Sequence, residues 1–203
     1  MCIRDRDSLK GLKVAVQGVG SVGSYLCEYL HEEGVELFIS DINEKKLKEI
    51  SDKTGAKIVD INAIHSQDVD VFAPCALGGG LNDDTIPQIK AKVIAGGANN
   101  QLLVEDKHGQ DLKDKGILYA PDYVINAGGL ISVYQELKGY KLDAVKQKTS
   151  QIYDTCLEIF EEADKANIPV HQASDAVAER RVKAVRGIVR TNTTQFTSTW
   201  VRN

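Results

Sequence analysis

The stretch of residues 13–41, KVAVQGVGSVGSYLCEYLHEEGVELFISD, constrains the fold more than any other part of the chain. It begins with a short apolar run, residues 14–16, which is typical of a buried parallel strand. A G-x-G-x-x-G segment follows, then apolar residues at helical spacing, and then a second apolar run, 35–40, that ends at Asp41. The stretch therefore predicts a strand–turn–helix–strand unit with a tight glycine turn at its first crossover.

Each glycine of that turn has a mechanical reason for being there. Gly18 permits the sharp turn from strand to helix, Gly20 lets backbone approach a pyrophosphate, and Gly23 lets the helix pack closely on the strand. The helix N-terminus offers N–H groups to phosphates. Asp41 can accept hydrogen bonds from a ribose. The pattern favours a dinucleotide site over the alternative of a glycine-rich turn beside a solvated Asp41. The predicted cofactor-binding residues here are Gly18, Val19, Gly20, Ser21, Val22, Gly23, Ser24, Asp41 and Ile42.

Composition narrows the class of protein. A net charge of −4 and a pI near 5.6 provide no basic face for nucleic acid. No apolar run approaches the roughly 20 residues of a membrane span, and residues 1–7 lack a signal-peptide core. The 4 cysteines and 4 histidines are dispersed without metal-ligand spacing, so we expect no metal site and a reducing cytoplasmic location.

Downstream of Asp41, short apolar runs alternate with helical patterns. Strands are predicted at 56–59, 69–73, 93–95 and 117–120, and helices at 43–55, 85–89 and within 105–115. This alternation predicts an α/β fold, a Rossmann-type, doubly wound, mostly parallel sheet. C-terminal helices are predicted at 130–137, 142–166 and 174–189, the last capped by Ser174.

The chain ends call for a domain interpretation. Residues 1–7, MCIRDRD, have no relation to the following strand and are interpreted as a non-native leader. Residues 8–190 are predicted to form one NAD-binding domain with its C-terminal helices, and the Thr- and Asn-rich residues 191–203 to form a loose tail.

In an open parallel sheet, ligands bind outside the carboxyl ends of the strands. The loops at those ends, of which residues 122–129 are the last, contain small residues and the amides of Asn99, Asn100 and Asn126, which could bind a carboxamide or a ribose. Each asparagine could instead bond its own backbone. Cys75 has no histidine nearby in sequence and is expected to lie beside the cofactor as a small apolar group. Residues 78–80 are three glycines without the lysine of a P-loop, and we interpret them as a flexible loop.

Seven motifs in order resemble the amino acid dehydrogenases, the superfamily of glutamate, leucine, phenylalanine and valine enzymes. They are VAVQGVGSVG, SDIN, DVDVFAPCALGG, LNDDTI, KVIAGGANNQL, GILYAPDYVINAGGLISVYQE and the region through AERR. The resemblance covers residues 11–184, and the leucine dehydrogenases are the nearest branch. It implies reversible oxidative deamination of a branched-chain L-amino acid to its 2-oxo acid and ammonia, with NAD as cofactor, and a homo-oligomeric assembly.

The resemblance assigns further residues. Cys75, Ala76 and Leu77 match the strand-end loop that lies along the cofactor, and Asn99 and Asn126 match asparagines near the nicotinamide. Asn100 matches a position that reaches the substrate. Leu130 and Val133 match two apolar residues of the side-chain pocket. The first is most often Val in the family, so Leu130 would shrink the pocket by about one methylene, worth roughly 1–3 kcal/mol of discrimination.

The chain also departs from the family. The family's substrate domain precedes the cofactor domain and carries catalytic lysines in a G-G-G-K region, and no segment here matches it. We therefore expect no catalytic residue in this chain, and we expect the chain alone to be inactive. Asp41 favours NAD over NADP because a carboxylate repels a 2′-phosphate. A stand-alone NAD-sensing module and a phenylalanine, valine or glutamate dehydrogenase stay open as alternatives.

Overall fold

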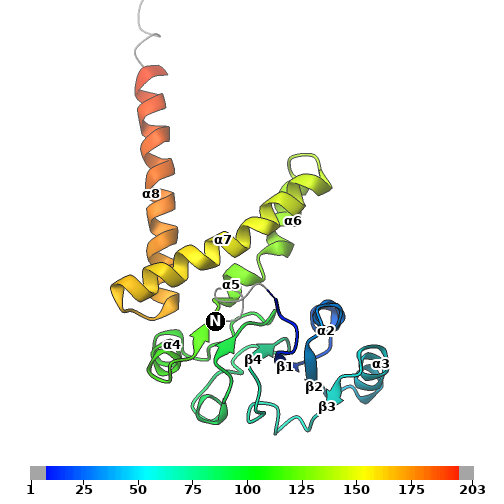
Figure 1. The fold of residues 1–203 in the computed structure, drawn as a ribbon. Coiled ribbons are helices and arrows are strands. Elements are labelled where there is room, and N and C mark those ends of the chain that lie inside the picture. Colours follow the sequence, from blue (N-terminus) through cyan, green and yellow to red (C-terminus); the bar gives the residue numbers. More distant parts are fainter. Residues whose placement is uncertain (1–7, 197–203) are drawn as a thin grey trace, which may run out of the picture.

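The computed structural model describes residues 8–196, and the surroundings of side chains as far as residue 186. The predicted leader, 1–7, lies outside the described residues. Six parallel strands form one sheet in the order β3-β2-β1-β4-β5-β6 (Figure 1). They are β1 (Lys13–Gln17), β2 (Glu36–Ser40), β3 (Lys57–Ile58), β4 (Val71–Pro74), β5 (Val93–Ile94) and β6 (Leu118–Tyr119). The predicted doubly wound parallel sheet is confirmed.

The strand order reverses at β1, which pairs with β2 on one side and with β4 on the other. Gln17, the last residue of β1, lies opposite Ser40 of β2 and Pro74 of β4. Crossovers on the two sides of such a switch point leave the sheet in opposite directions, so a crevice opens at the carboxyl ends of the strands. The loops predicted to bind ligands therefore meet at this crevice.

Alternate residues of the strands feed two separate cores, as a pleated sheet requires. On one face Val14 and Val16 pack with residues of α2 (Ser21–Glu32) and α3 (Glu44–Thr54). On the other face Ala15 packs in a core with residues of η1 (Ile86–Gln88) and α4 (Glu105–Asp114). The sheet is thus buried on both faces, which holds the strand ends in fixed relation.

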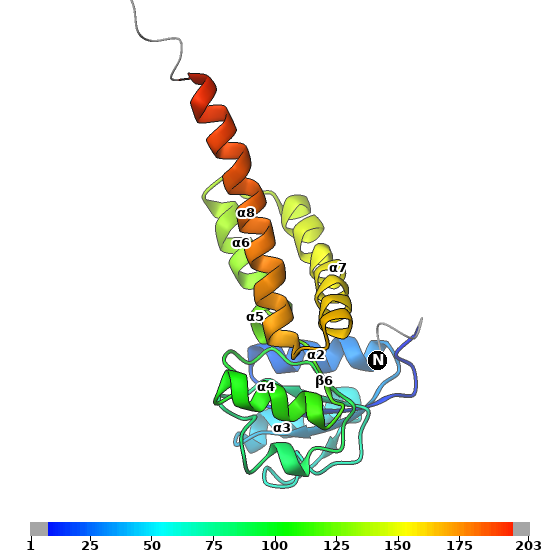
Figure 2. The same ribbon diagram turned by 90° about the vertical axis from the view of Figure 1, so that its left-hand side faces the viewer.

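Three C-terminal helices project from the sheet-containing body (Figures 1 and 2). After the short α5 (Asp122–Ile125) come α6 (Gly128–Glu136), α7 (Leu142–Ala166) and α8 (Val170–Phe196). Cys156 and Phe160 of α7 pack with Ala120, next to β6. Further along α7, Ile159 and Ala163 form a small core with the start of α8. Among the described residues, no helix has the length and apolarity to cross a membrane.

The predicted boundaries of α3 are accurate because local residues determine them. The Asn43 side chain accepts a hydrogen bond from the Lys46 backbone N–H at 3.1 Å, which caps the helix start. Gly55 ends the helix at φ +70°, in the left-handed region that favours glycine.

Three predictions about helices are wrong. Residues 122–125 were expected to be loop but form α5, since Pro121 and Asp122 suit a first turn and four residues are too few to show periodicity. Ser174 does not cap α8, because the helix begins at Val170, directly after Pro169. The helix also continues through residues 191–196 of the predicted loose tail, where no proline stops it. The rest of that tail, residues 197–203, lies outside the described residues.

Candidate nucleotide-binding site

The turn between β1 and α2 is closely packed at two of its three motif glycines. Gly18 has φ +95°, and a Cβ atom there would lie 2.9 Å from the Ala76 backbone nitrogen. A Cβ on Gly23 would lie 1.9 Å from the Gly18 carbonyl oxygen. A larger residue at either position therefore requires backbone movement. These contacts are the tight turn and the close helix–strand approach that the motif predicts.

Gly20 differs from the other two because it faces open space. A Cβ on Gly20 would meet no atom within 4 Å. Gly20 is the N-cap of α2, no side chain caps that helix, and its first turn contains no acidic residue. The helix N-terminus therefore presents its positive end without a competing carboxylate from that turn. This arrangement suits a phosphate group.

Asp41 is attached to the turn by its carboxylate. One oxygen accepts a hydrogen bond from the Val19 N–H at 2.7 Å, and the other accepts from the Asn43 N–H at 2.8 Å. A carboxylate has about four acceptor positions, so each oxygen keeps one for a ribose hydroxyl. The carboxylate thus links the end of β2 to the glycine turn and stays half-buried at the crevice.

The other predicted residues of this region fall into two groups. The Val19 side chain is completely buried, and the Ser24 hydroxyl donates to the Val19 carbonyl at 2.7 Å, so both support the turn from inside. Ser21, Val22 and Ile42 are exposed. Val22 also borders the loop after β5, since a Cβ on Gly97 would lie 2.5 Å from its Cγ1.

The loop after β4 contains Cys75, Ala76 and Leu77. The Cys75 Sγ accepts a hydrogen bond from the Gly97 N–H at 3.4 Å, and Leu77 is 88% exposed. Burial raises the pKa of the Cys75 thiol, and the Gly97 N–H offsets this only in part. The thiol therefore stays protonated at neutral pH, which fits the predicted small apolar neighbour rather than a nucleophile.

The three asparagines lie on loops at the same end of the sheet. The Asn126 amide donates to the Asn99 Oδ1 at 2.6 Å, which joins the loops after β6 and β5. Asn100 has φ +52°, and its carbonyl accepts from the Gly79 N–H at 2.7 Å. A Cβ on Gly78 would lie 2.7 Å from the Asn99 carbonyl oxygen. The glycines interpreted as a flexible loop therefore pack closely against the asparagines.

Leu130 and Val133 lie one turn apart on α6 and are 74% and 57% exposed. Among the described residues, neither side chain belongs to a buried apolar cluster. The pairing of Asn99 with Asn126, by contrast, is direct.

Gln101 was not predicted, although it lies within the motif GGANNQL. Its side chain is 1% exposed, and its Nε2 donates to the carbonyls of Gly96 at 2.7 Å and Ala98 at 3.0 Å. The one signal in the sequence that could have identified Gln101 is its position next to the apolar pair 102–103. A polar side chain that is buried beside apolar residues needs a hydrogen-bond partner.

Comparison with known proteins agrees with this geometry. The model of the Glutamate/Leucine/Phenylalanine/Valine dehydrogenase family matches residues 36–187. The chain belongs to this family. It is 52% identical over 180 residues to a leucine dehydrogenase of Geobacillus stearothermophilus, covering 89% of this chain and 49% of the relative. It is 52% identical over 174 residues to an L-tryptophan dehydrogenase of Nostoc punctiforme, covering 86% and 49%.

A solved structure of the family superimposes closely. The crystal structure of L-tryptophan dehydrogenase from Nostoc punctiforme has a TM-score of 0.87 and 51% identity, and the match covers 88% of this chain and 54% of that chain. The chain therefore spans about half the length of these family members. The family consists of NAD(P)-dependent dehydrogenases, and these relatives do not favour a stand-alone sensing module.

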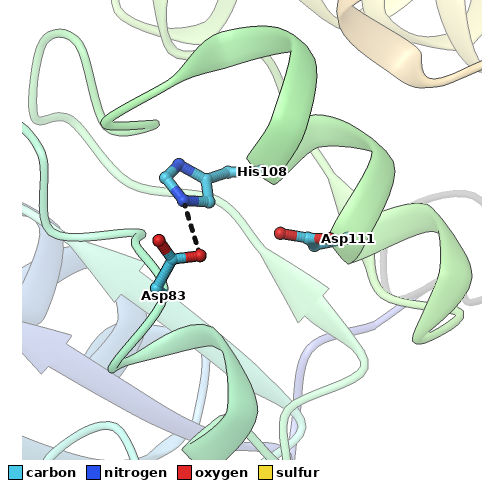
Figure 3. A group of neighbouring side chains, drawn as sticks. All are labelled: Asp83, His108 and Asp111. Carbon is cyan, nitrogen blue, oxygen red and sulfur yellow. Dashed lines mark ion pairs between the residues drawn. The ribbon is translucent and has the colours of Figure 1, made fainter.

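Away from the crevice, Asp83, His108 and Asp111 place side-chain atoms within 4.8 Å of one another (Figure 3). The His108 Nδ1 accepts a hydrogen bond from the Val104 N–H at 2.9 Å. Because a backbone N–H only donates, Nδ1 is unprotonated, and a neutral ring has its proton on Nε2, 3.5 Å from Asp83. A metal ion would need that nitrogen deprotonated.

A cation already pairs with this cluster. The Lys107 ammonium donates to Asp83, and this hydrogen bond keeps the pKa of Asp83 below its usual range. Val104 is the N-cap of α4, so His108 satisfies one N–H at the start of that helix. We therefore interpret the cluster as a helix cap with a surface ion pair, a structural feature of this family member.

Proposed function

We propose that this chain is the NAD-binding half of an amino acid dehydrogenase. The complete enzyme would catalyse reversible oxidative deamination of a branched-chain, leucine-like L-amino acid to its 2-oxo acid and ammonia. One observation carries the proposal: the β1–α2 turn with Asp41 and the paired Asn99 and Asn126 lie at the same carboxyl edge of one sheet. The family membership supplies the reaction class.

The proposed roles follow the chemistry of each group. The N–H groups at the start of α2 bind the pyrophosphate, and Asp41 accepts from the adenosine ribose. Cys75, Ala76 and Leu77 line the cofactor, and Asn99 and Asn126 bind toward its nicotinamide end. Asn100, Leu130 and Val133 contact the amino acid. These groups orient two reactants, which is the main contribution a protein makes to cofactor chemistry.

The balanced reaction shows what this half leaves to the rest of the enzyme. The amino acid, NAD⁺ and water become the 2-oxo acid, ammonium, NADH and a proton, and the bound nicotinamide supplies the hydride acceptor. Hydrolysis of the imine needs a general base, and the substrate carboxylate needs a cationic partner. We assign both groups to the half of the relatives' length that this chain does not span.

The test is a calorimetric titration of the 203-residue chain with NAD, together with a dehydrogenase assay on L-leucine, L-valine and L-phenylalanine. We expect saturable NAD binding and no reduction of NAD. Absence of NAD binding would overturn the proposed role of the turn. Turnover by the chain alone would show that it contains its own catalytic base and is not a cofactor-binding half.

Cofactor choice rests on Asp41. A carboxylate repels a 2′-phosphate and bonds a free 2′-hydroxyl, so we propose NAD rather than NADP. An Asp41→Ser variant should bring the dissociation constants for NAD and NADP closer together. Because Asp41 also holds the Val19 and Asn43 N–H groups, Asp41→Asn is the matched control that keeps one acceptor. Tighter binding of NADP than of NAD by the unmodified chain would reverse the assignment.

The apolar residues Leu130 and Val133 favour an apolar amino acid over glutamate. The relatives include an L-tryptophan dehydrogenase and a phenylalanine dehydrogenase. By these names, members of the family act on amino acids with different apolar side chains. We also propose a homo-oligomer for the complete enzyme, which sedimentation of that enzyme would test. A purely monomeric complete enzyme would contradict this.

A further inference from the structure

Gln101 is a completely buried neutral amide in the middle of the candidate site. With 1% of its side chain exposed, it has no access to bulk water. Its Nε2 donates two hydrogen bonds, to the Gly96 and Ala98 carbonyls, and its Oε1 has no partner among the described residues. A buried amide that leaves one acceptor unsatisfied is costly, so its two donated bonds must contribute enough to retain it.

The segment that Gln101 holds is packed on two other loops. The Ala98 N–H donates to the Pro74 carbonyl at 2.9 Å, and a Cβ on Gly96 would lie 2.2 Å from the same oxygen. The next residue, Gly97, touches both Cys75 and Val22 of the glycine turn. The two bonds from Gln101 therefore fix the shape of the loop after β5, and that loop packs against the loops after β4 and β1.

The same loop presents two asparagines. Asn99 accepts the hydrogen bond from Asn126, and Asn100 occupies the left-handed region at φ +52°. Asparagine adopts this region more readily than other residues that carry a Cβ. Gln101 follows Asn100 directly, so its anchored side chain holds the backbone on the C-terminal side of Asn100.

We propose that Gln101 is a positioning residue for the nicotinamide end of the site. It acts through the loop of residues 96–100, whose shape depends on the two N–H donors of its amide. This inference rests on the proposed NAD-binding function. A thioether at position 101 fills similar volume without donors, and a carboxylate would place negative charge against two carbonyl oxygens.

The experiment compares two ligands on the full 203-residue chain. NAD spans the whole crevice, whereas ADP-ribose lacks the nicotinamide ring and depends on the glycine turn and Asp41. In Gln101→Met we expect the dissociation constant for NAD to rise about tenfold, the effect of losing about 1.4 kcal/mol of binding. The constant for ADP-ribose should change less than twofold. Calorimetry measures both.

A second variant adds a pH readout that loss of packing does not produce. In Gln101→Glu, protonation of the carboxyl restores one of the two donors. As the pH is lowered from 8 to 5.5, the dissociation constant of this variant for NAD should therefore fall relative to that of the wild-type chain. Binding by Gln101→Met should follow the wild-type pH profile.

Thr54→Val is the matched control, since Thr54 is also buried and donates to a backbone carbonyl, that of Ile50, at 2.7 Å. It should lower thermal stability and leave both dissociation constants within twofold. Equal loss of NAD and ADP-ribose affinity in Gln101→Met, or no loss of either, would overturn the positioning role. A wild-type chain that fails to bind NAD would overturn the proposed function itself, together with this inference.

Discussion

The β1–α2 turn and helix α6 both carry residues predicted to contact ligands, and they differ in how much of their surroundings this chain supplies. At the turn, Gly18 lies against the Ala76 backbone, Gly23 lies against the Gly18 carbonyl, and Val19 is completely buried. On α6, Leu130 is 74% exposed and Val133 is 57% exposed. Contacts within the chain determine the shape of the proposed cofactor site. They do not determine that of the proposed substrate wall, the apolar side chains of Leu130 and Val133.

Exposed apolar side chains close together on one helix are typical of a surface that another surface covers. The chain spans about half the length of its relatives. Three sets of variants test the contrast between the two regions.

The largest effect is expected from Gly23→Ala. The new Cβ would lie 1.9 Å from the Gly18 carbonyl oxygen, so α2 must shift away from β1. Overpacking of this kind costs about 3 kcal/mol, more than the ~1 kcal/mol that alanine gains in helix propensity. Urea denaturation followed by circular dichroism measures the loss.

Gly20→Ala is the control, because a Cβ there meets no atom within 4 Å. It should keep the stability of the wild-type chain within about 0.5 kcal/mol and still weaken NAD binding, since the methyl group points to the proposed pyrophosphate position. Equal stability of the two alanine variants would show that the turn is less closely packed than its geometry indicates.

Local signals explain why this region was predictable from sequence. The signals for the strand, the glycine turn, the helix cap and the helix end at Gly55 each lie within a few residues of the feature they predict. The bounds of β1 were predicted to within one residue at each end. The alternation of elements was enough to place the loops of Asn99 and Asn126 at one edge. Their direct hydrogen bond spans 27 residues and depends on how the loops pack, which no local pattern encodes.

The failures have the same physical origin. Gln101 was missed because its two hydrogen bonds, to the Gly96 and Ala98 carbonyls, depend on how the loop after β5 folds. Ser174 has a capping residue's side chain, but packing of α8 on α7 starts at Val170 and carries Ser174 inside the helix. Sequence identifies residues with a capacity for an interaction, and tertiary packing decides which of them use it.

A second test uses Cys27 of α2, which is buried in the apolar core between α2 and the sheet. Burial raises the pKa of Cys27 from its ordinary value of 9.0 to about 12, and the nearby Cys75 and Glu28 add to the shift. The folded state therefore holds this proton more tightly than the unfolded chain. The resulting stability is complete below about pH 9 and is lost as the pH rises toward 12.

At pH 10.5 the wild-type chain should have lost about 2 kcal/mol of unfolding free energy through Cys27 alone. In Cys27→Val, which keeps a small apolar side chain, that part of the pH dependence disappears. Urea denaturation of both proteins at pH 8.0 and 10.5 gives the difference. Equal losses of unfolding free energy in the two proteins would mean that water reaches the Cys27 side chain in the folded state.

The smallest effect is expected on α6. Leu130→Ser and Val133→Ser remove apolar side chains that are more than half exposed, so each should change the stability of this chain by less than about 0.5 kcal/mol. Ile159→Ala on the neighbouring α7, where the side chain is 1% exposed, should cost about 3 kcal/mol and shows that the assay detects a real core. A loss above about 1 kcal/mol for either serine variant would mean that the chain covers its own substrate wall. In the complete enzyme the same substitutions should raise the KM for leucine, because there the wall would contact the amino acid side chain.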